Sequence, residues 1–109
     1  MYKVVIASNK LPGKSARVHA WNDGPGDCII TFTFSDNTRE LVDNVYWTRP
    51  YIDDYTALKR VVDNNNLTEL IFEDGWDGTY DRPWEDSAKP LYDKFFKSWL
   101  SDDISVKFK

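Results

Sequence analysis

Six carboxylates and three large aromatic side chains share one short stretch of the chain, residues 73–86. The segment contains one basic residue, Arg82, and Gly75, Gly78 and Pro83 oppose any regular helix or strand across it. Loops of this length in compact domains are usually functional or disordered, and three aromatics argue against disorder. Aromatic anchors inside a polar rim are typical of protein interfaces. The candidate partner-binding residues are therefore Asp74, Trp76, Asp77, Tyr80, Asp81, Trp84, Glu85 and Asp86.

Nucleophilic catalysis by a cysteine–histidine pair is the first alternative to consider. His19 and Cys28 are the only residues of their kinds, on neighbouring strands of one expected hairpin. If Ala16, Val18 and Ala20 face the same core as Cys28, then His19 points to the opposite side of the sheet, which forbids direct proton transfer. We expect a small buried cysteine and a solvated histidine.

Metal and carboxylate chemistry find little support in the spacing of the acids. Asp74, Asp77 and Asp81 lack the order and the closing glutamate of an EF-hand loop, and one Cys with one His does not make a zinc site. We expect no metal and no cofactor. Asp43 and Glu69 are the candidates for inward-facing acids, although exposed alternating strand positions explain both more simply. Gly24-Pro25-Gly26 lacks the following helix and lysine of a phosphate loop.

Charge is segregated along the chain. Residues 1–22 carry +4, residues 23–86 carry −10 and residues 87–109 carry +2, for a net charge of −4. The acidic middle would repel phosphates, so we expect no direct nucleic-acid binding. A solvated strand edge, where basic residues discourage aggregation, would account for Lys3, Lys10, Lys14 and Arg17.

The elements that must position these residues follow from hydrophobic periodicity. Runs of β-compatible residues predict strands at about 2–7, 15–21, 28–34, 39–47, 67–72 and 103–108. Helices are expected at about 53–63 and 88–100. In the first helix, Asp53 and Asp54 suit the N-terminus, and the predicted apolar face is Ile52, Tyr55, Leu58, Val61 and Val62. In the second, Ser87 is the expected cap and the apolar stripe is Leu91, Tyr92, Phe95, Phe96, Trp99 and Leu100.

These elements predict an α+β fold in which two helices pack on one face of a mainly antiparallel sheet of five to six strands. A chain of 109 residues is one domain, 1–109. We expect no signal peptide and no transmembrane helix. A single cysteine excludes an intrachain disulfide and favours a reducing, cytoplasmic location. Monomer and homodimer both stay open.

Two function classes remain. In the first, the protein is a non-enzymatic binding module whose acidic surface docks on a basic protein. The expected docking place is the nucleic-acid-binding cleft of a nucleic-acid-handling enzyme, because arginines arranged for phosphates also bind carboxylates. Small acidic anti-CRISPR and DNA-mimic inhibitors made by phages or mobile elements are similar in type and size, although no motif aligns; such a protein would act in the host cytoplasm. In the second, segment 73–86 serves a small-ligand domain or a carboxylate-dependent hydrolase.

The orientation of the three aromatics separates interface from core. Trp76, Tyr80 and Trp84 either face a partner or fold back over the sheet, and the sequence favours neither.

Overall fold

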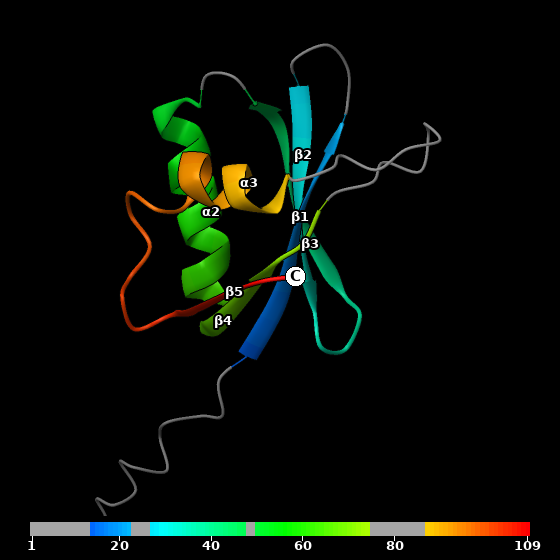
Figure 1. The fold of residues 1–109 in the computed structure, drawn as a ribbon, viewed down its shortest axis with the longest axis vertical. Coiled ribbons are helices and arrows are strands. Elements are labelled where there is room, and N and C mark those ends of the chain that lie inside the picture. The colour runs from blue at the N-terminus through cyan, green and yellow to red at the C-terminus, as the bar shows by residue number, and fades with distance from the viewer. Residues whose placement is uncertain (1–13, 23–26, 48–49, 75–86) are drawn as a thin grey trace, which may run out of the picture.

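Alternating apolar residues build one sheet in the computed structural model, which describes residues 14–22, 27–47, 50–74 and 87–109 (Figure 1). Within these ranges the strands are β1 (Lys14–Asn22), β2 (Asp27–Phe34), β3 (Arg39–Tyr46), β4 (Leu67–Phe72) and β5 (Ser105–Phe108). The helices are α2 (Ile52–Asn64) and α3 (Ala88–Phe95). The α+β class is therefore as predicted, and the predicted strand at 2–7 lies outside the described residues.

The described sheet has the strand order β3-β2-β1-β4-β5 and is mixed rather than mainly antiparallel. Strand β2 is antiparallel to both β1 and β3, while β4 is parallel to both β1 and β5. The connections explain the difference. The tight turn at 35–38 joins the antiparallel strands β2 and β3. Helix α2, and α3 together with the turns after it, instead return the chain to the end of the sheet at which the preceding strand began, so the next strand runs parallel.

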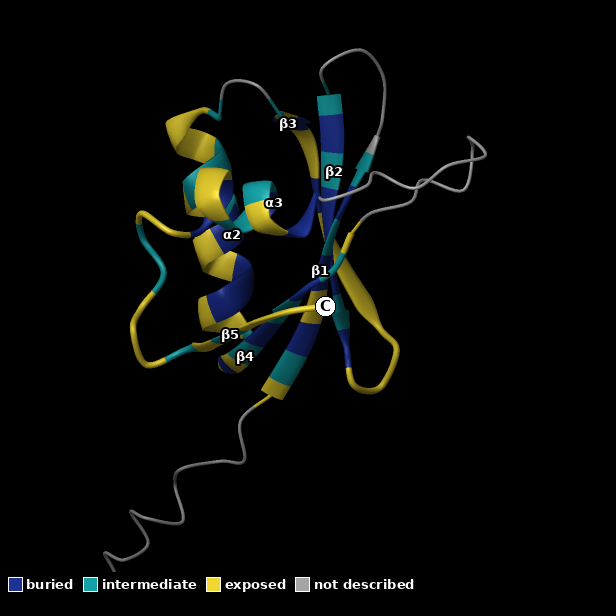
Figure 2. Ribbon diagram, viewed as in Figure 1, coloured by how far each residue is buried: buried dark blue, intermediate teal, exposed yellow. Residues whose placement is uncertain are grey.

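One alternating set of strand residues meets the helices. Strand residues such as Val18, Ile30 and Phe72 are fully buried in the same core as Leu58 of α2 and Leu91 of α3. Figure 1 shows both helices to the left of β1 and β2, and Figure 2 shows buried residues on the side of α2 that is turned toward the sheet. Cys28 belongs to this core, as predicted.

Aromatic edges fill the centre of the core. The Phe96 ring lies 4.9 Å from the Phe72 ring at 75° and 6.0 Å from the Phe32 ring at 67°. Edge-to-face contacts of this kind stabilise beyond the apolar area they bury. Phe95 and Phe96, two residues of the predicted apolar stripe, are both fully buried.

An acidic residue fixes the first turn of α2, as expected. The buried face of this helix is narrower than predicted. The Tyr51 amide donates to the Asp54 carboxylate at 2.8 Å. The buried residues are Leu58, Val61 and Val62, whereas Ile52 is 78% exposed. Ile52 and Leu58 are six residues apart in the helix. Each step of three residues falls about 60° short of a full turn, so the two side chains point about 120° apart and Ile52 lies away from the core.

The last helix ends earlier than predicted, at Phe95 instead of residue 100. The Trp99 indole N–H donates to the Phe95 carbonyl, which competes with the backbone bond that would continue the helix there. Both Phe96 and Lys97 donate their amides to the Tyr92 carbonyl, and the turns that follow lead to β5. Neither described helix combines the length and the apolar character that a bilayer crossing requires.

Candidate functional site

The candidate segment enters the described structure only at its first two residues, Glu73 and Asp74. Of the predicted partner-binding residues, Asp74 can therefore be placed. The others lie outside the described residues: Trp76, Asp77, Tyr80, Asp81, Trp84, Glu85 and Asp86. What the structure does show is how the chain leaves β4 before this segment and enters α3 after it.

A hydrogen bond closes the base of the segment. The Asp74 carboxylate accepts the amide of Ala88, the first residue of α3, at 3.0 Å across 14 positions of sequence. This amide is one of the helix N-terminal donors that lack an intrahelical acceptor, and a carboxylate there also favours the helix dipole. Ser87, the expected cap, makes no side-chain capping bond and is buried. We call the Asp74–Ala88 pair the closed base.

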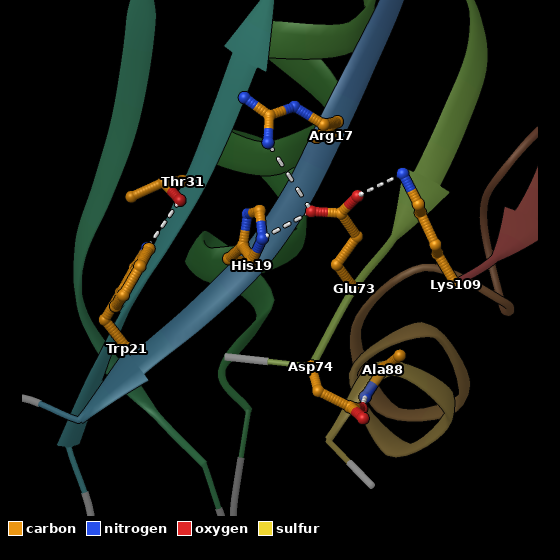
Figure 3. A network of polar contacts seen from close by, with 8 residues as sticks. All are labelled: Arg17, His19, Trp21, Thr31, Glu73, Asp74, Ala88 and Lys109. Atoms are coloured by element: carbon orange, nitrogen blue, oxygen red, sulfur yellow. Dashed lines mark hydrogen bonds and ion pairs between the residues drawn. The ribbon is translucent and has the colours of Figure 1, made fainter. Parts of the chain in front are cut away.

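Glu73 is held on the sheet by its backbone and its side chain. Its amide donates to the Val18 carbonyl at 3.0 Å, which extends the parallel pairing of β4 with β1 by one residue. Its carboxylate lies 2.7 Å from His19 Nε2, 3.7 Å from Arg17 and 3.8 Å from the Lys109 ammonium (Figure 3). With its side chain only 15% exposed, Glu73 lies close to three basic groups, of which His19 alone is within hydrogen-bond distance.

His19 is not the solvated histidine expected from the sequence, since its side chain is only 13% exposed. Burial lowers its pKa, against the opposing effect of Glu73 and together with that of the Arg17 charge. Nε2 lies within hydrogen-bond distance of the Glu73 carboxylate, and the buried Nδ1 has no hydrogen-bond partner among the described residues. The centroid of the Trp21 ring lies 5.4 Å from that of the His19 ring, and the Trp21 indole N–H donates to the Thr31 hydroxyl at 2.6 Å (Figure 3).

This polar cluster lies on the side of the sheet opposite the core, which we call the open face. In β1 it is formed by the alternate residues Arg17, His19 and Trp21. His19 pairs with Thr31 in β2, whereas Cys28 points into the core, so His19 and Cys28 face opposite sides as predicted. The separation leaves no direct proton path between imidazole and thiol.

The basic residues of β1 do not lie on a strand edge. Strand β1, which contains Lys14 and Arg17, is the central strand of the described sheet, so the edge explanation for these two residues is wrong. Arg17 lies in one cross-strand row with Arg39 of β3 and Lys107 of β5, through the pairs Thr33–Arg39, Arg17–Thr33, Arg17–Ile71 and Ile71–Lys107. The open face thus carries a cross-strand row of basic residues, of which Arg17 and Lys107 form ion pairs with Glu73 and Glu69.

The two other candidate acids, Glu69 and Asp43, have structural explanations that involve no catalytic role. Glu69 accepts the Ser15 hydroxyl and the Lys107 ammonium, each at 2.8 Å, and these hydrogen bonds, Lys107 first, lower its pKa. Asp43 is exposed. Among the residues that the structure describes, no group of three His, Cys, Asp or Glu side chains is placed to hold a metal ion.

The arrangement is suited to holding a segment in place. Both carboxylates at the start of the segment are engaged by partners far away in sequence, at 54 positions for Glu73 and His19 and 14 for Asp74 and Ala88. No local motif marks such partners, which is why sequence reasoning missed the His19–Glu73 pair and the Asp74–Ala88 bond.

Comparisons with known proteins supply no relative, because no protein-family model, no curated protein and no solved structure matches the chain. Function is therefore inferred from the residues and their geometry.

Proposed function

We propose that this protein is a small, non-enzymatic binding module that presents segment 73–86 to a basic partner. The partner class that fits is a nucleic-acid-handling enzyme, and docking on its phosphate-binding cleft would make the protein an inhibitor. Arginines that hold phosphates accept carboxylates in the same forked geometry, and opposite charge accelerates encounter.

The closed base supports this proposal most directly. Asp74 joins the end of β4 to the start of α3, while the Glu73 backbone is bonded to β1. Segment 75–86 therefore leaves and re-enters the fold at two points that are close together and anchored in the sheet and in a helix. Fixing the ends of a binding segment lowers the entropy lost when a partner orders it.

The closed base also divides the carboxylates into two groups. Glu73 and Asp74 have partners within the protein. The proposal therefore assigns the partner contact to the remaining four acids, which with Arg82 give residues 75–86 a net charge of −3: Asp77, Asp81, Glu85 and Asp86. The desolvated anchors of the interface would be Trp76, Tyr80 and Trp84.

Affinity capture from a cell lysate at low and then at high salt tests the proposal. The immobilised protein is expected to retain a nucleic-acid-binding enzyme at low salt and to release it as salt rises, because exposed charge pairs are screened. A variant with Trp76→Ala and Asp77→Lys should no longer retain that enzyme.

The matched control changes two exposed acids outside the segment, Asp102→Asn and Asp103→Asn, which lie in the turn before β5. This control should retain the enzyme. Equal capture by the Trp76/Asp77 variant and the wild type would place the interface elsewhere and overturn the proposal.

A further inference from the structure

An exposed apolar cluster lies where β3 ends and α2 begins. Tyr46 is 39% exposed, Tyr51 is 56% exposed and Ile52 is 78% exposed. The Tyr46 and Tyr51 rings stack with centroids 6.3 Å apart and 29° between their planes. We call these three residues the β3–α2 cluster. Figure 2 shows the exposed first turn of α2 close to the end of β3.

Neither the helix nor the core requires these side chains. The buried face of α2 begins at Leu58, and the capping bonds of the first turn use the Tyr51 backbone, not its ring. Two large side chains more than half exposed at adjacent positions contribute little to folding. Tyrosine is, in contrast, enriched among the residues that dominate binding at protein interfaces.

Three acidic residues are neighbours of the cluster in strand pairing or in sequence. Asp27 pairs with Tyr46 across β2 and β3, Asp43 precedes Tyr46 in β3, and Asp53 follows Ile52 in α2. None of these three carboxylates makes an ion pair with the other described residues. The nearby cation Lys94 is engaged by Trp47, with its ammonium 5.6 Å from the ring and 3.3 Å from the carbonyl oxygen.

Topology places this cluster at the same end of the sheet as the closed base. Strand β3 runs in the same direction as β1 because both are antiparallel to β2, and β4 is parallel to β1. The carboxyl ends of β3 and β4 therefore point toward the same end of the sheet. They are about 14 Å apart across three strand spacings and about 16 Å apart along the strands, because the register sets Tyr46 about five residues further along β1 than Phe72. A single partner surface of ordinary size spans this distance.

We propose that the β3–α2 cluster is a docking surface for an arginine-bearing segment of a basic partner protein. A guanidinium group stacks on the face of a tyrosine ring and at the same time donates forked hydrogen bonds to a carboxylate, a combination that lysine does not reproduce. Exposed tyrosine rings with acidic neighbours fit that chemistry. The inference rests on the proposed function in one respect, since it assigns the partner that engages segment 73–86 to this surface as well.

Titration of the isotope-labelled protein with a synthetic arginine–glycine repeat peptide, followed by NMR, tests this inference. The amide signals of Tyr46, Tyr51, Ile52 and Asp53 are expected to shift and saturate, and a lysine–glycine repeat of equal length and charge should bind more weakly. Equal binding of the two peptides would overturn the role of the rings.

Three variants separate this surface from the segment. Tyr51→Ser with Ile52→Ala keeps the charge and the helix, since Ser is favoured at an N-cap and Ala within a helix. This variant should reduce the affinity for the arginine–glycine peptide about fivefold or more. Leu41→Ala is the matched control, because Leu41 is 57% exposed on the open face, and it should bind as the wild type does. The third variant is Asp77→Asn with Asp81→Asn, within the segment.

The pattern of losses distinguishes the two proposals. Loss in the Tyr51/Ile52 variant supports the docking surface, whether or not the segment variant also loses affinity. Loss in the segment variant alone overturns the docking surface and leaves the proposed function standing. Loss in the Tyr51/Ile52 variant alone supports the surface and counts against the segment. Unchanged affinity in both variants, or no binding of the peptide, overturns the docking surface.

Discussion

A single imidazole reports on the polar cluster of the open face, because the chain contains one histidine. Burial holds the pKa of His19 below its ordinary value of 6.5 in spite of the adjacent carboxylate. We predict that NMR titration of the wild type gives a pKa below 6.5. Glu73→Gln should lower the pKa further by removing a favourable negative charge, and Arg17→Gln should raise it by removing a positive one. Shifts of the same sign in both variants would contradict this account.

The same shift makes stability depend on pH. A histidine whose pKa is lower in the folded state binds fewer protons there than in the unfolded chain, so stability falls as pH falls from 6.5 toward the folded pKa. Urea unfolding should show this loss in the wild type between about pH 7.5 and 5.5. His19→Gln is expected to unfold with a flatter dependence over that range. An equal slope in both proteins would show that another group titrates.

Asp74 offers a test of capping across a long sequence separation. Asp74→Ala removes the acceptor of the Ala88 amide and should lower the free energy of unfolding by about 1 kcal/mol, the usual cost of losing an N-cap. Asp93→Ala, which removes only an exposed pair with Lys89 in the same helix, should cost less than about 0.5 kcal/mol. Urea denaturation measures both, and equal losses would argue against a capping role for Asp74.

At the scale of elements, the strands and helix α2 follow closely from their sequence pattern, whereas the C-terminal end of α3 does not. Strand β4 spans 67–72 as predicted, because its short β-compatible run lies between the turn residues Asn64-Asn65-Asn66 and the acidic segment that begins at Glu73. Helix α3 is shorter than its apolar stripe: the Lys97 amide donates to the Tyr92 carbonyl in place of the Asp93 carbonyl, and the Trp99 indole bonds the Phe95 carbonyl. The Asp74 cap and the His19–Glu73 pair join distant positions, and periodicity carries no information about such partners.

The packing of α3 on the sheet gives the element-scale prediction. Phe96 is fully buried and contacts the rings of Phe32 and Phe72. Phe96→Ala should lower the free energy of unfolding by about 3–5 kcal/mol, because it removes buried area and leaves a cavity. The exposed Leu41→Ala control should change it by less than about 0.5 kcal/mol. A loss near the control value in urea denaturation would mean that α3 is not packed as described.

At the scale of the whole molecule, one end of the sheet collects the features that bear on function. The carboxyl ends of β1, β3, β4 and β5 share this end, because β2 alone of the described strands runs the other way. The closed base and the β3–α2 cluster both lie there. Asp27, Asp53 and Asp74, which belong to distant parts of the acidic middle of the chain, also lie toward this end.

Replacement of residues 75–86 by a glycine–serine linker of equal length separates a partner-facing segment from a core-forming one. The buried apolar residues of the described ranges form a continuous core between the sheet and both helices, and the closed base joins Asp74 to Ala88 without the segment. Equal length keeps the closure entropy nearly constant. If Trp76, Tyr80 and Trp84 face a partner, the replacement should change the free energy of unfolding by less than about 1 kcal/mol while abolishing partner capture. If they cover the sheet instead, the loss of their buried area should cost about 3 kcal/mol or more, and the assignment of these rings to an interface would then be wrong.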